Sequence, residues 1–271
     1  HQRLLLLCQW RPPRPPRQQA PAPRAARAGS IVGETDWKPL PRAPGTFFPS
    51  GYVPSTTAEE SIGSFERFGY NAGKVAQLTT KGQEISEDLK EAEMHVAPGH
   101  CAVLAAYTEE PGFYRDLNYT SRTPGKNTDV KLKKYRDYLY HMENALSALD
   151  NYIGDSFRCT DNFMSPTAYS EGKTITFQQL TSSTRSMSVA ARFAGKQGKK
   201  LSGSMFVIRG TSGKDIEPFS AYPDEQEVLF KFNSHFRVKR KVTDDATKKA
   251  MLPDLAAYNM EDLEVWELQQ L

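Results

Sequence analysis

The clearest pattern in the chain is a stripe of large apolar residues. Its members are Leu132, Tyr135, Leu139, Met142, Leu146 and Leu149. The steps between them alternate between three and four residues, which is the period of one face of an α-helix. The stripe therefore predicts a long helix with this face packed in the core.

The segments before this stripe predict shorter elements. In residues 37–73 turn residues alternate with aromatic ones, which predicts irregular chain packed against a domain. Residues 83–95 and residues 100–108 each predict a helix, with the Ala97-Pro98-Gly99 stretch ending the first. A polar loop is expected at residues 120–128, just before the long helix.

After Gly154 the pattern changes to short apolar runs separated by turn residues, as at Gly210 to Gly213. The predicted strands are residues 156–159, 174–177, 205–208, 228–230, 236–242 and 263–268. One helix, residues 184–194, interrupts them. Helices followed by mostly antiparallel strands predict an α+β fold.

Composition indicates one domain with a tail. The chain has 271 residues, 38% hydrophobic and 25% charged, an ordinary balance for a globular protein. Residues 1–45 are rich in Pro, Arg and Ala and predict a disordered tail. Residues 46–271 are expected to form the domain, with a helical part at about 80–150 and a strand-rich core at about 155–270. The net charge of +3 is too small to indicate a nucleic-acid-binding protein.

The cysteines predict neither a disulfide framework nor a metal site. Cys8, Cys101 and Cys159 are far apart in the sequence, and no His or Cys cluster has the spacing of metal ligands. We therefore expect no metal, while pairing of Cys101 with Cys159 stays open.

No membrane span is expected, because no apolar run approaches the ~20 residues that one requires. The location of the protein stays open. The chain begins at His1 rather than Met, so a clipped signal sequence upstream would make it secreted or cell-surface. Only in that case would the Asn118-Tyr119-Thr120 sequon have a meaning.

Two glutamates, Glu225 and Glu227, stand two positions apart where an apolar strand begins. Residues at i and i+2 of a strand share a face, so we expect both carboxylates to project together. Such a pair suits chemistry on a glycosidic bond. The local sequence alone favours the alternative, two exposed glutamates at the start of a strand with no function.

Two further features of the strand-rich half could carry chemistry. Arg158 lies between Phe157 and Cys159, where its guanidinium requires an anion; a structural salt bridge is the alternative. The hydroxyl run Thr181 to Thr184 could bind a ligand or cap the helix that follows. The sequence contains no P-loop, Rossmann fingerprint or Gly-x-Ser-x-Gly elbow.

In this order, the arginine, the hydroxyl run and the Glu-x-Glu pair resemble the motifs of the arginine-specific mono-ADP-ribosyltransferases, the ecto-enzyme type in particular. Their signature is an Arg, a Ser-Thr-Ser stretch and a Glu-x-Glu pair. The similarity extends to Ala106-Tyr107-Thr108 and Leu117-Asn118 and covers roughly residues 85–245. It implies a helical part packed on two mostly antiparallel sheets that form an NAD-binding cleft.

The resemblance also implies roles for single residues, with NAD as co-substrate and no metal. Arg158 would bind the pyrophosphate of NAD, and Ser182, beside Ser183, would orient the catalytic glutamate and the nicotinamide ribose. Glu227 would hold the ribose and stabilise its developing positive charge, while Glu225 would help to deprotonate the acceptor arginine. The partner would be a protein with an accessible arginine, with no nucleic acid involved.

The segment from Gly210 to Asp224 would be the loop that recognises the target protein. Phe219 and Tyr222 lie in it, and one of them could stack on the acceptor; that both belong to the core is the equal alternative.

This chain departs from the family pattern at two places. Cys159 follows the arginine where the family commonly has glycine, and it either crowds the phosphate site or points into the core. Ser182-Ser183-Thr184 replaces Ser-Thr-Ser, a mild change. Since both glutamates are present we predict an active transferase. An NAD glycohydrolase and a non-catalytic NAD-binding module of the same fold are the alternatives.

Overall fold

The computed structural model describes residue 48 and residues 51–109, 112–122 and 126–271, without the side chains of 122 and 126–131. These residues belong to one compact unit, Lys38–Leu271. The predicted tail, residues 1–45, lies outside the described residues. None of the helices in the described ranges is long and apolar enough to span a membrane.

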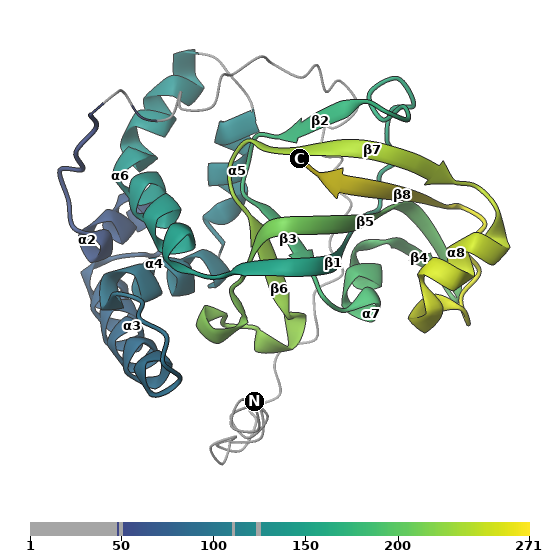
Figure 1. The fold of residues 1–271 in the computed structure, drawn as a ribbon. Helices are drawn as coiled ribbons and strands as arrows, with labels where there is room; N and C mark the ends of the chain where they lie inside the picture. Colours follow the sequence, from purple (N-terminus) through teal and green to yellow (C-terminus); the bar gives the residue numbers. More distant parts are fainter. Residues whose placement is uncertain (1–47, 49–50, 110–111, 123–125) are drawn as a thin grey trace. The chain divides into compact units, whose positions relative to one another are not determined.

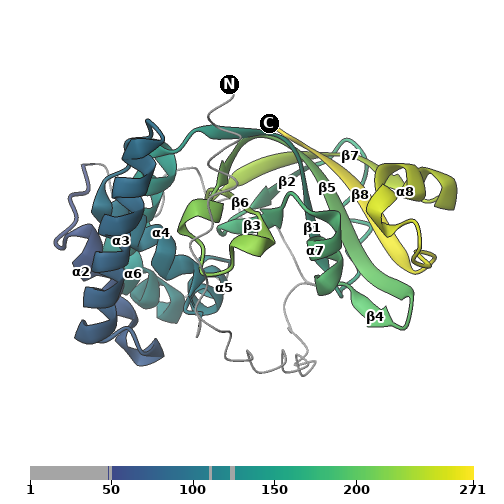
Figure 2. The ribbon, with the colours of Figure 1, turned by 90° about the horizontal axis from the view of Figure 1, so that it is seen from below.

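Helices form the N-terminal part of this unit. They are α2 (Ala58–Ile62), the 3-10 helix η1 (Gly63–Phe68), α3 (Ala72–Glu91), α4 (Pro98–Thr108), α5 (Tyr114–Arg122) and α6 (Lys126–Ala148). Figures 1 and 2 show them gathered beside the strands. α4 packs against α2, α3 and α6 and is buried from Cys101 to Thr108. Gly82 of α3 permits this packing, because a Cβ there would come within 2.5 Å of the Pro98 carbonyl oxygen.

The apolar stripe lies on α6, as predicted. All six of its residues, from Leu132 to Leu149, are buried in the core of the helical part. The helix from His100 to Thr108 is confirmed as the greater part of α4.

Other helix boundaries differ from the prediction. α3 begins at Ala72 rather than Gln83, because the Asn71 side chain accepts a hydrogen bond from the Lys74 N–H and caps the helix. The segment predicted to be irregular contains η1 and α2, and Thr57 caps α2 through a capping box with Glu60. The predicted polar loop is also wrong at both ends, since α5 continues to Arg122 and α6 begins at Lys126.

The strands are joined in one connected eight-stranded sheet. They are β1 (Asn151–Thr160), β2 (Thr174–Phe177), β3 (Thr181–Thr184), β4 (Gly195–Gln197), β5 (Lys200–Asp215), β6 (Glu227–Phe230), β7 (Ser234–Val242) and β8 (Leu263–Gln270). Their order is β1-β3-β6-β5-β8-β7-β2, with β4 beside β5 and a further pairing of β1 with β5. Among the described pairings of one named strand with another, only β5 with β8 is parallel. The α+β prediction is confirmed, whereas the strands are connected in one sheet rather than two.

Short helical elements connect these strands. They are α7 (Met187–Ala190), η2 (Ala191–Phe193), η3 (Glu217–Phe219), η4 (Pro223–Glu225), α8 (Asp245–Met251) and η5 (Pro253–Leu255). The helix predicted at 184–194 is therefore shorter and divided. The turn predicted from Gly210 to Gly213 is absent, because β5 continues through it. At Gly213 a Cβ would come within 2.6 Å of the Val228 side chain, so this glycine serves close packing.

Three apolar clusters hold the unit together. The first lies among the helices and also includes Ile216, Phe219 and Leu229, which attaches η3 and β6 to the helical part. The other two lie within the strand-rich part. Cys101 belongs to the first cluster and Cys159 to the second, and both are free thiols, so they do not pair.

Candidate active site

The sheet brings together three of the predicted site residues from strands far apart in sequence. In the antiparallel ladder of β3 with β6, Ser182 pairs with Leu229 and Thr184 pairs with Glu227. The Ser182 side chain hydrogen-bonds to the Glu227 carboxylate. From β1, the Arg158 guanidinium donates to the Ser182 carbonyl oxygen at 2.9 Å. Arg158, Ser182 and Glu227 therefore form one cluster.

Glu227 is the carboxylate of this cluster, and its pKa is strongly raised. It is 9% exposed, and burial raises its pKa to about 7. The Ser182 hydrogen bond and the Arg158 charge act to lower the pKa of Glu227, whereas the Glu225 charge acts to raise it. A carboxylate that titrates near neutrality inside a polar cluster is typical of a catalytic group.

Glu225 does not lie on the strand, so the argument from strand alternation is wrong. It ends the 3-10 helix η4, and Gln226 then takes a left-handed conformation with φ 49° before β6 begins at Glu227. The turn at Gln226 replaces the predicted extended backbone. The charge of Glu225 still raises the pKa of Glu227, which shows that the two side chains are near each other.

The hydroxyl run forms strand β3 rather than a helix cap. The cap of α7 is Ser186, whose side chain accepts from the Val189 N–H. Ser183 points away from Ser182: its hydroxyl donates to the Val228 carbonyl oxygen at 2.8 Å and shares a hydrogen bond of 2.9 Å with Ser156 Oγ. Its hydroxyl thus stabilises the sheet instead of joining the cluster.

Strand alternation also decides the direction of Arg158 and Cys159. Phe157 and Cys159 lie in the same apolar cluster, and burial raises the pKa of the Cys159 thiol to about 12. Cys159 therefore points into the core. The predicted alternative for Arg158, a salt bridge, is not found with any described residue, and its remaining N–H groups fit the oxygens of a pyrophosphate.

The segment between β5 and β6 contains Phe219, Tyr222 and Glu225. Phe219 is 1% exposed and belongs to the helical core, whereas Tyr222 is 46% exposed. Of the two aromatic residues, Tyr222 alone is placed to meet a large partner. We call this segment, residues 216–226, the acceptor loop.

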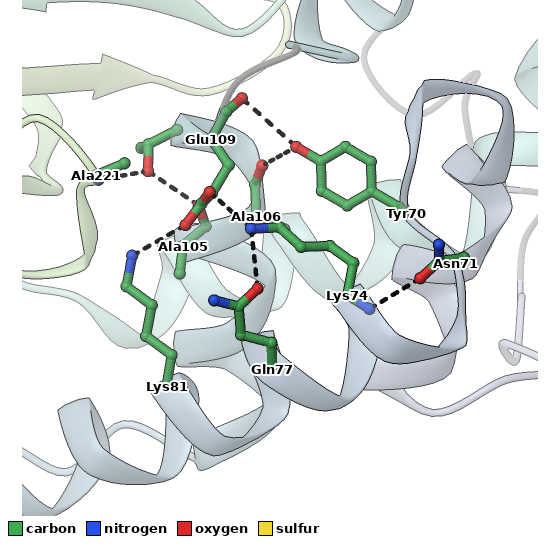
Figure 3. Close-up of polar contacts among 10 residues, drawn as sticks. Tyr70, Asn71, Lys74, Gln77, Lys81, Ala105, Ala106, Glu109 and Ala221 are labelled. Carbon is green, nitrogen blue, oxygen red and sulfur yellow. Dashed lines mark hydrogen bonds and ion pairs between the residues drawn. The ribbon is translucent and has the colours of Figure 1, made fainter. Parts of the chain in front are cut away.

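The acceptor loop is fastened at both ends and in the middle. The Arg185 side chain forms an ion pair with Asp215 at 3.1 Å and another with Glu217. The Arg185 backbone N–H donates to the Gln226 carbonyl oxygen. In the middle, the Ala221 N–H donates to Thr108 Oγ1 at 2.9 Å, the contact from α4 seen in Figure 3. These contacts hold Glu225 in a fixed backbone position.

Comparison with known proteins identifies the family. The model of the family described as NAD:arginine ADP-ribosyltransferase matches residues 73–258, a range that includes the whole cluster. The chain belongs to this family.

Two curated relatives are similar to this chain over part of their length. A putative NAD(+)–arginine ADP-ribosyltransferase of Mycobacterium avium is 34% identical over 155 residues, which is 56% of this chain and 17% of that protein. The T-cell ecto-ADP-ribosyltransferase 1 of Rattus norvegicus is 30% identical over 132 residues, which is 48% of this chain and 44% of that protein. The chain thus matches less than half of either relative.

Solved structures share the ADP-ribosyltransferase fold. The Vis toxin of Vibrio splendidus, solved in complex with agmatine, has a TM-score of 0.52 at 20% identity and covers 72% of this chain and 85% of its own. Exoenzyme S of Pseudomonas aeruginosa, solved with a human 14-3-3 protein and bound to Carba-NAD, has a TM-score of 0.51 at 20% identity. It covers 79% of this chain and 86% of its own.

Two residues of the chain join the cluster without having been predicted as site residues. Tyr107, at the end of α4, hydrogen-bonds to the Ser182 side chain. Asn118 of α5 donates from Nδ2 to the Tyr107 hydroxyl at 3.2 Å. The sequence signal was present, because both lie in the helical motifs that resemble the family, but no local pattern connects them with Ser182.

This contact also decides the meaning of the sequon. The Nδ2 atom of Asn118, to which a glycan would be attached, is engaged with the Tyr107 hydroxyl, and Thr120 is fully buried. In the folded chain the Asn118 amide therefore has a structural contact at the atom that the sequon would modify.

One buried acceptor beside the cluster has no partner within the ranges that the structure describes. The Asn118 Oδ1 atom is buried without a hydrogen-bond partner among the described residues. A ligand donor at this position would satisfy it. Together with the open N–H groups of Arg158, this orphaned acceptor fits a ligand that carries both hydroxyl groups and phosphates. As to metals, the described part of the chain contains no group of three or more His, Cys, Asp or Glu placed to hold one.

Proposed function

We propose that this chain is an NAD-dependent mono-ADP-ribosyltransferase that transfers ADP-ribose from NAD to arginine side chains of proteins and releases nicotinamide. The observation that carries the proposal is the buried Glu227 carboxylate, held by the Ser182 side chain and facing the Arg158 charge. The family and the names of the two curated relatives support arginine as the acceptor.

Arg158 and Ser182 prepare the substrate in this proposal. Arg158 holds the pyrophosphate of NAD through forked, charge-assisted hydrogen bonds, which its planar guanidinium makes better than a lysine would. Ser182 keeps the Glu227 carboxylate in one orientation. Glu227 accepts a hydrogen bond from a ribose hydroxyl and stabilises the positive charge that develops at the ribose C1′ as its bond to nicotinamide breaks.

Glu225 completes the transfer. The bonding electrons of the broken C1′–N bond leave with neutral nicotinamide, and a guanidinium nitrogen of the acceptor forms the new bond to C1′. That nitrogen is cationic at neutral pH and requires the loss of one proton, which Glu225 accepts. Its place at the end of the acceptor loop puts this base beside Tyr222, where a target protein would approach.

We place the NAD-binding cleft where α4 and α5 meet β3 and β6. Support comes from the contacts of Tyr107 with Ser182 and of Asn118 with Tyr107, which connect the helices to the strands. Within the connected sheet, the segment β1-β3-β6 would form the cleft wall and β5-β8-β7-β2 the supporting sheet. The transferase domain would comprise residues 46–271, with residues 1–45 as a tail.

The two alternatives lose support in the structure. The main sequence feature in favour of a non-catalytic module was Cys159. Its side chain lies in the core, away from the cluster. An NAD glycohydrolase would not need Glu225, whereas the loop around Glu225 is held by Thr108, Thr184 and Arg185.

The test is incubation of the folded protein with NAD labelled in the adenosine part and with agmatine, a small guanidine. We expect labelled ADP-ribosyl-agmatine and free nicotinamide in equal amounts. Nicotinamide without the adduct would support the glycohydrolase. NAD binding with neither product would support the non-catalytic module. A Glu227→Gln variant, which should form neither product, is the control for contaminating activity.

A further inference from the structure

A buried tyrosine hydroxyl lies beside the residues at the centre of the proposed reaction. Tyr107 is 3% exposed, and its hydroxyl contacts two side chains, Asn118 from α5 and Ser182 from β3. Burial is the largest cause of its raised pKa, and the nearby Glu227 charge is the next. Tyr107 thus stays a neutral hydroxyl that can both donate and accept.

The chemistry of these groups fixes the direction of each hydrogen bond. An ionised Glu227 can only accept, so the Ser182 hydroxyl must donate to it. Ser182 Oγ is then free to accept, and the proton of the Tyr107 hydroxyl is the donor. The Asn118 amide donates to the Tyr107 oxygen at 3.2 Å. The four side chains form a chain of donors that ends at the carboxylate, and such chains polarise one another.

We propose that Tyr107 is a positioning residue, which aims the Ser182 hydroxyl at Glu227 and is itself oriented by Asn118. This inference deepens the proposed function and rests on it. Tyr107 acts through Ser182, so its hydroxyl helps to keep Glu227 anionic and in one rotamer for the approach of the ribose.

The end of α4 is held firmly enough for this task. The Glu109 carboxylate, next but one after Tyr107, binds Lys74 at 2.9 Å and Lys81 at 3.3 Å, both from α3. Tyr70 donates its hydroxyl hydrogen bond to the Ala106 carbonyl oxygen at 3.2 Å. Figure 3 shows these contacts around the last turn of α4. Because the helix end is fixed on both sides, the Tyr107 ring cannot easily move from Ser182.

The pKa of Glu227 is the quantity that this role should change. Arg158 from β1, Ser182 from β3 and Glu225 from η4 act directly on the pKa of Glu227, and Tyr107 from α4 contacts Ser182. Replacing Tyr107 by Phe removes the donor to Ser182 and so weakens the hydrogen bond that favours the Glu227 anion. The charged groups stay in place. The pKa of Glu227 should therefore rise, because its anion is less well solvated.

The experiment compares Tyr107→Phe with Tyr138→Phe. Tyr138 is fully buried in the same helical core, and its hydroxyl donates to the Val103 carbonyl oxygen at 2.9 Å, away from the cluster. Each variant loses one tyrosine hydroxyl oxygen from the same helical core. The rate of transfer to agmatine is measured against pH. We expect the limb that rises with pH to move upward by about half to one pH unit in Tyr107→Phe alone, as the loss of one hydrogen bond predicts.

A second measurement separates this inference from the proposed function. The carboxyl carbons of 13C-labelled glutamates are titrated by NMR, with the Glu227 signal assigned by its loss in Glu227→Gln. If the wild-type protein forms no adduct, the proposed function is wrong, and the titration still tests the role of Tyr107. A Glu227 pKa that is the same in wild type, Tyr107→Phe and Tyr138→Phe would overturn the inference.

Asn118→Ala provides a test that does not depend on the folding of Tyr107→Phe. This variant leaves the tyrosine in place and removes its orienting donor. We expect the pKa of Glu227 to rise by a smaller amount than in Tyr107→Phe. An unchanged pKa in Asn118→Ala would refute the part of the proposal that concerns Asn118.

Discussion

The Thr184 hydroxyl donates a hydrogen bond to the backbone carbonyl oxygen of Glu225 at 2.6 Å. Thr184 also pairs with Glu227 in the ladder of β3 with β6. One residue of β3 therefore fixes the backbone on both sides of the turn at Gln226. The two carboxylates are neighbours because of this strand pairing, although they do not share a strand.

This arrangement predicts different results for the two carboxylates. Glu227→Gln should lower both transfer to agmatine and NAD hydrolysis by about 100-fold or more, the usual loss when a group that stabilises transition-state charge is removed. Glu225→Gln should lose transfer and keep part of the NAD hydrolysis. In hydrolysis the acceptor is water, so no guanidinium has to be deprotonated. Separate assays of nicotinamide release and adduct formation check this. Equal residual activities in the two variants would refute the division of roles.

The raised pKa of Glu227 predicts that ionisation of this buried carboxyl lowers the stability of the folded chain. Its pKa is about 7 in the folded chain against 4.5 for an ordinary glutamate. Between these two pH values the folded state binds more protons than the unfolded state, so stability falls as the pH rises. Below pH 4.5 the contribution is fully present, and above pH 7 it is lost.

Glu227→Gln should therefore be more stable than the wild type at pH 8, by on the order of 2 to 3 kcal/mol. At pH 4 the two should unfold alike. Urea unfolding at both pH values measures the difference. A gain that is the same at pH 4 and pH 8 would show that the ionisation of Glu227 is not its cause.

The ion pairs of Arg185 predict a selective effect on transfer. Arg185→Ala frees Asp215 and Glu217 at the start of the acceptor loop. Glu225 should then be held less well, and transfer to agmatine should fall by about 10- to 100-fold while NAD hydrolysis changes much less. Arg240→Ala removes another part-buried ion pair, with Glu267 of β8, and should leave both rates unchanged. An equal loss of both activities in Arg185→Ala would contradict a role confined to the loop.

Phe219 and Tyr222 should respond in opposite ways to replacement by Ala. Phe219→Ala should lower the free energy of unfolding by about 3 to 5 kcal/mol, because a buried ring leaves a cavity. Tyr222→Ala should change stability little and raise the KM for a protein acceptor, while the KM for NAD is kept. Phe163→Ala, at another exposed aromatic residue, is the control. If Tyr222→Ala leaves acceptor kinetics unchanged, Tyr222 has no part in recognition.

The sequence alone predicted the elements whose evidence is local. The stripe of α6 and the apolar strand residues around Arg158 and Val228 depend on neighbours a few residues away, and these were confirmed. The ordered Arg, hydroxyl and Glu-x-Glu motifs identified the family before the fold was known. What the sequence determined was thus the set of chemical groups and their order along the chain.

The tertiary structure decided how those groups face one another. The turn at Gln226 depends on contacts of β3 with the acceptor loop, and the direction of Ser183 depends on its bonds to Ser156 and Val228. The contact of Tyr107 with Ser182 joins a helix to a strand. Hydrogen bonds between distant segments form only when packing brings them together, so no local pattern could place Glu225 in a turn or Tyr107 beside Glu227.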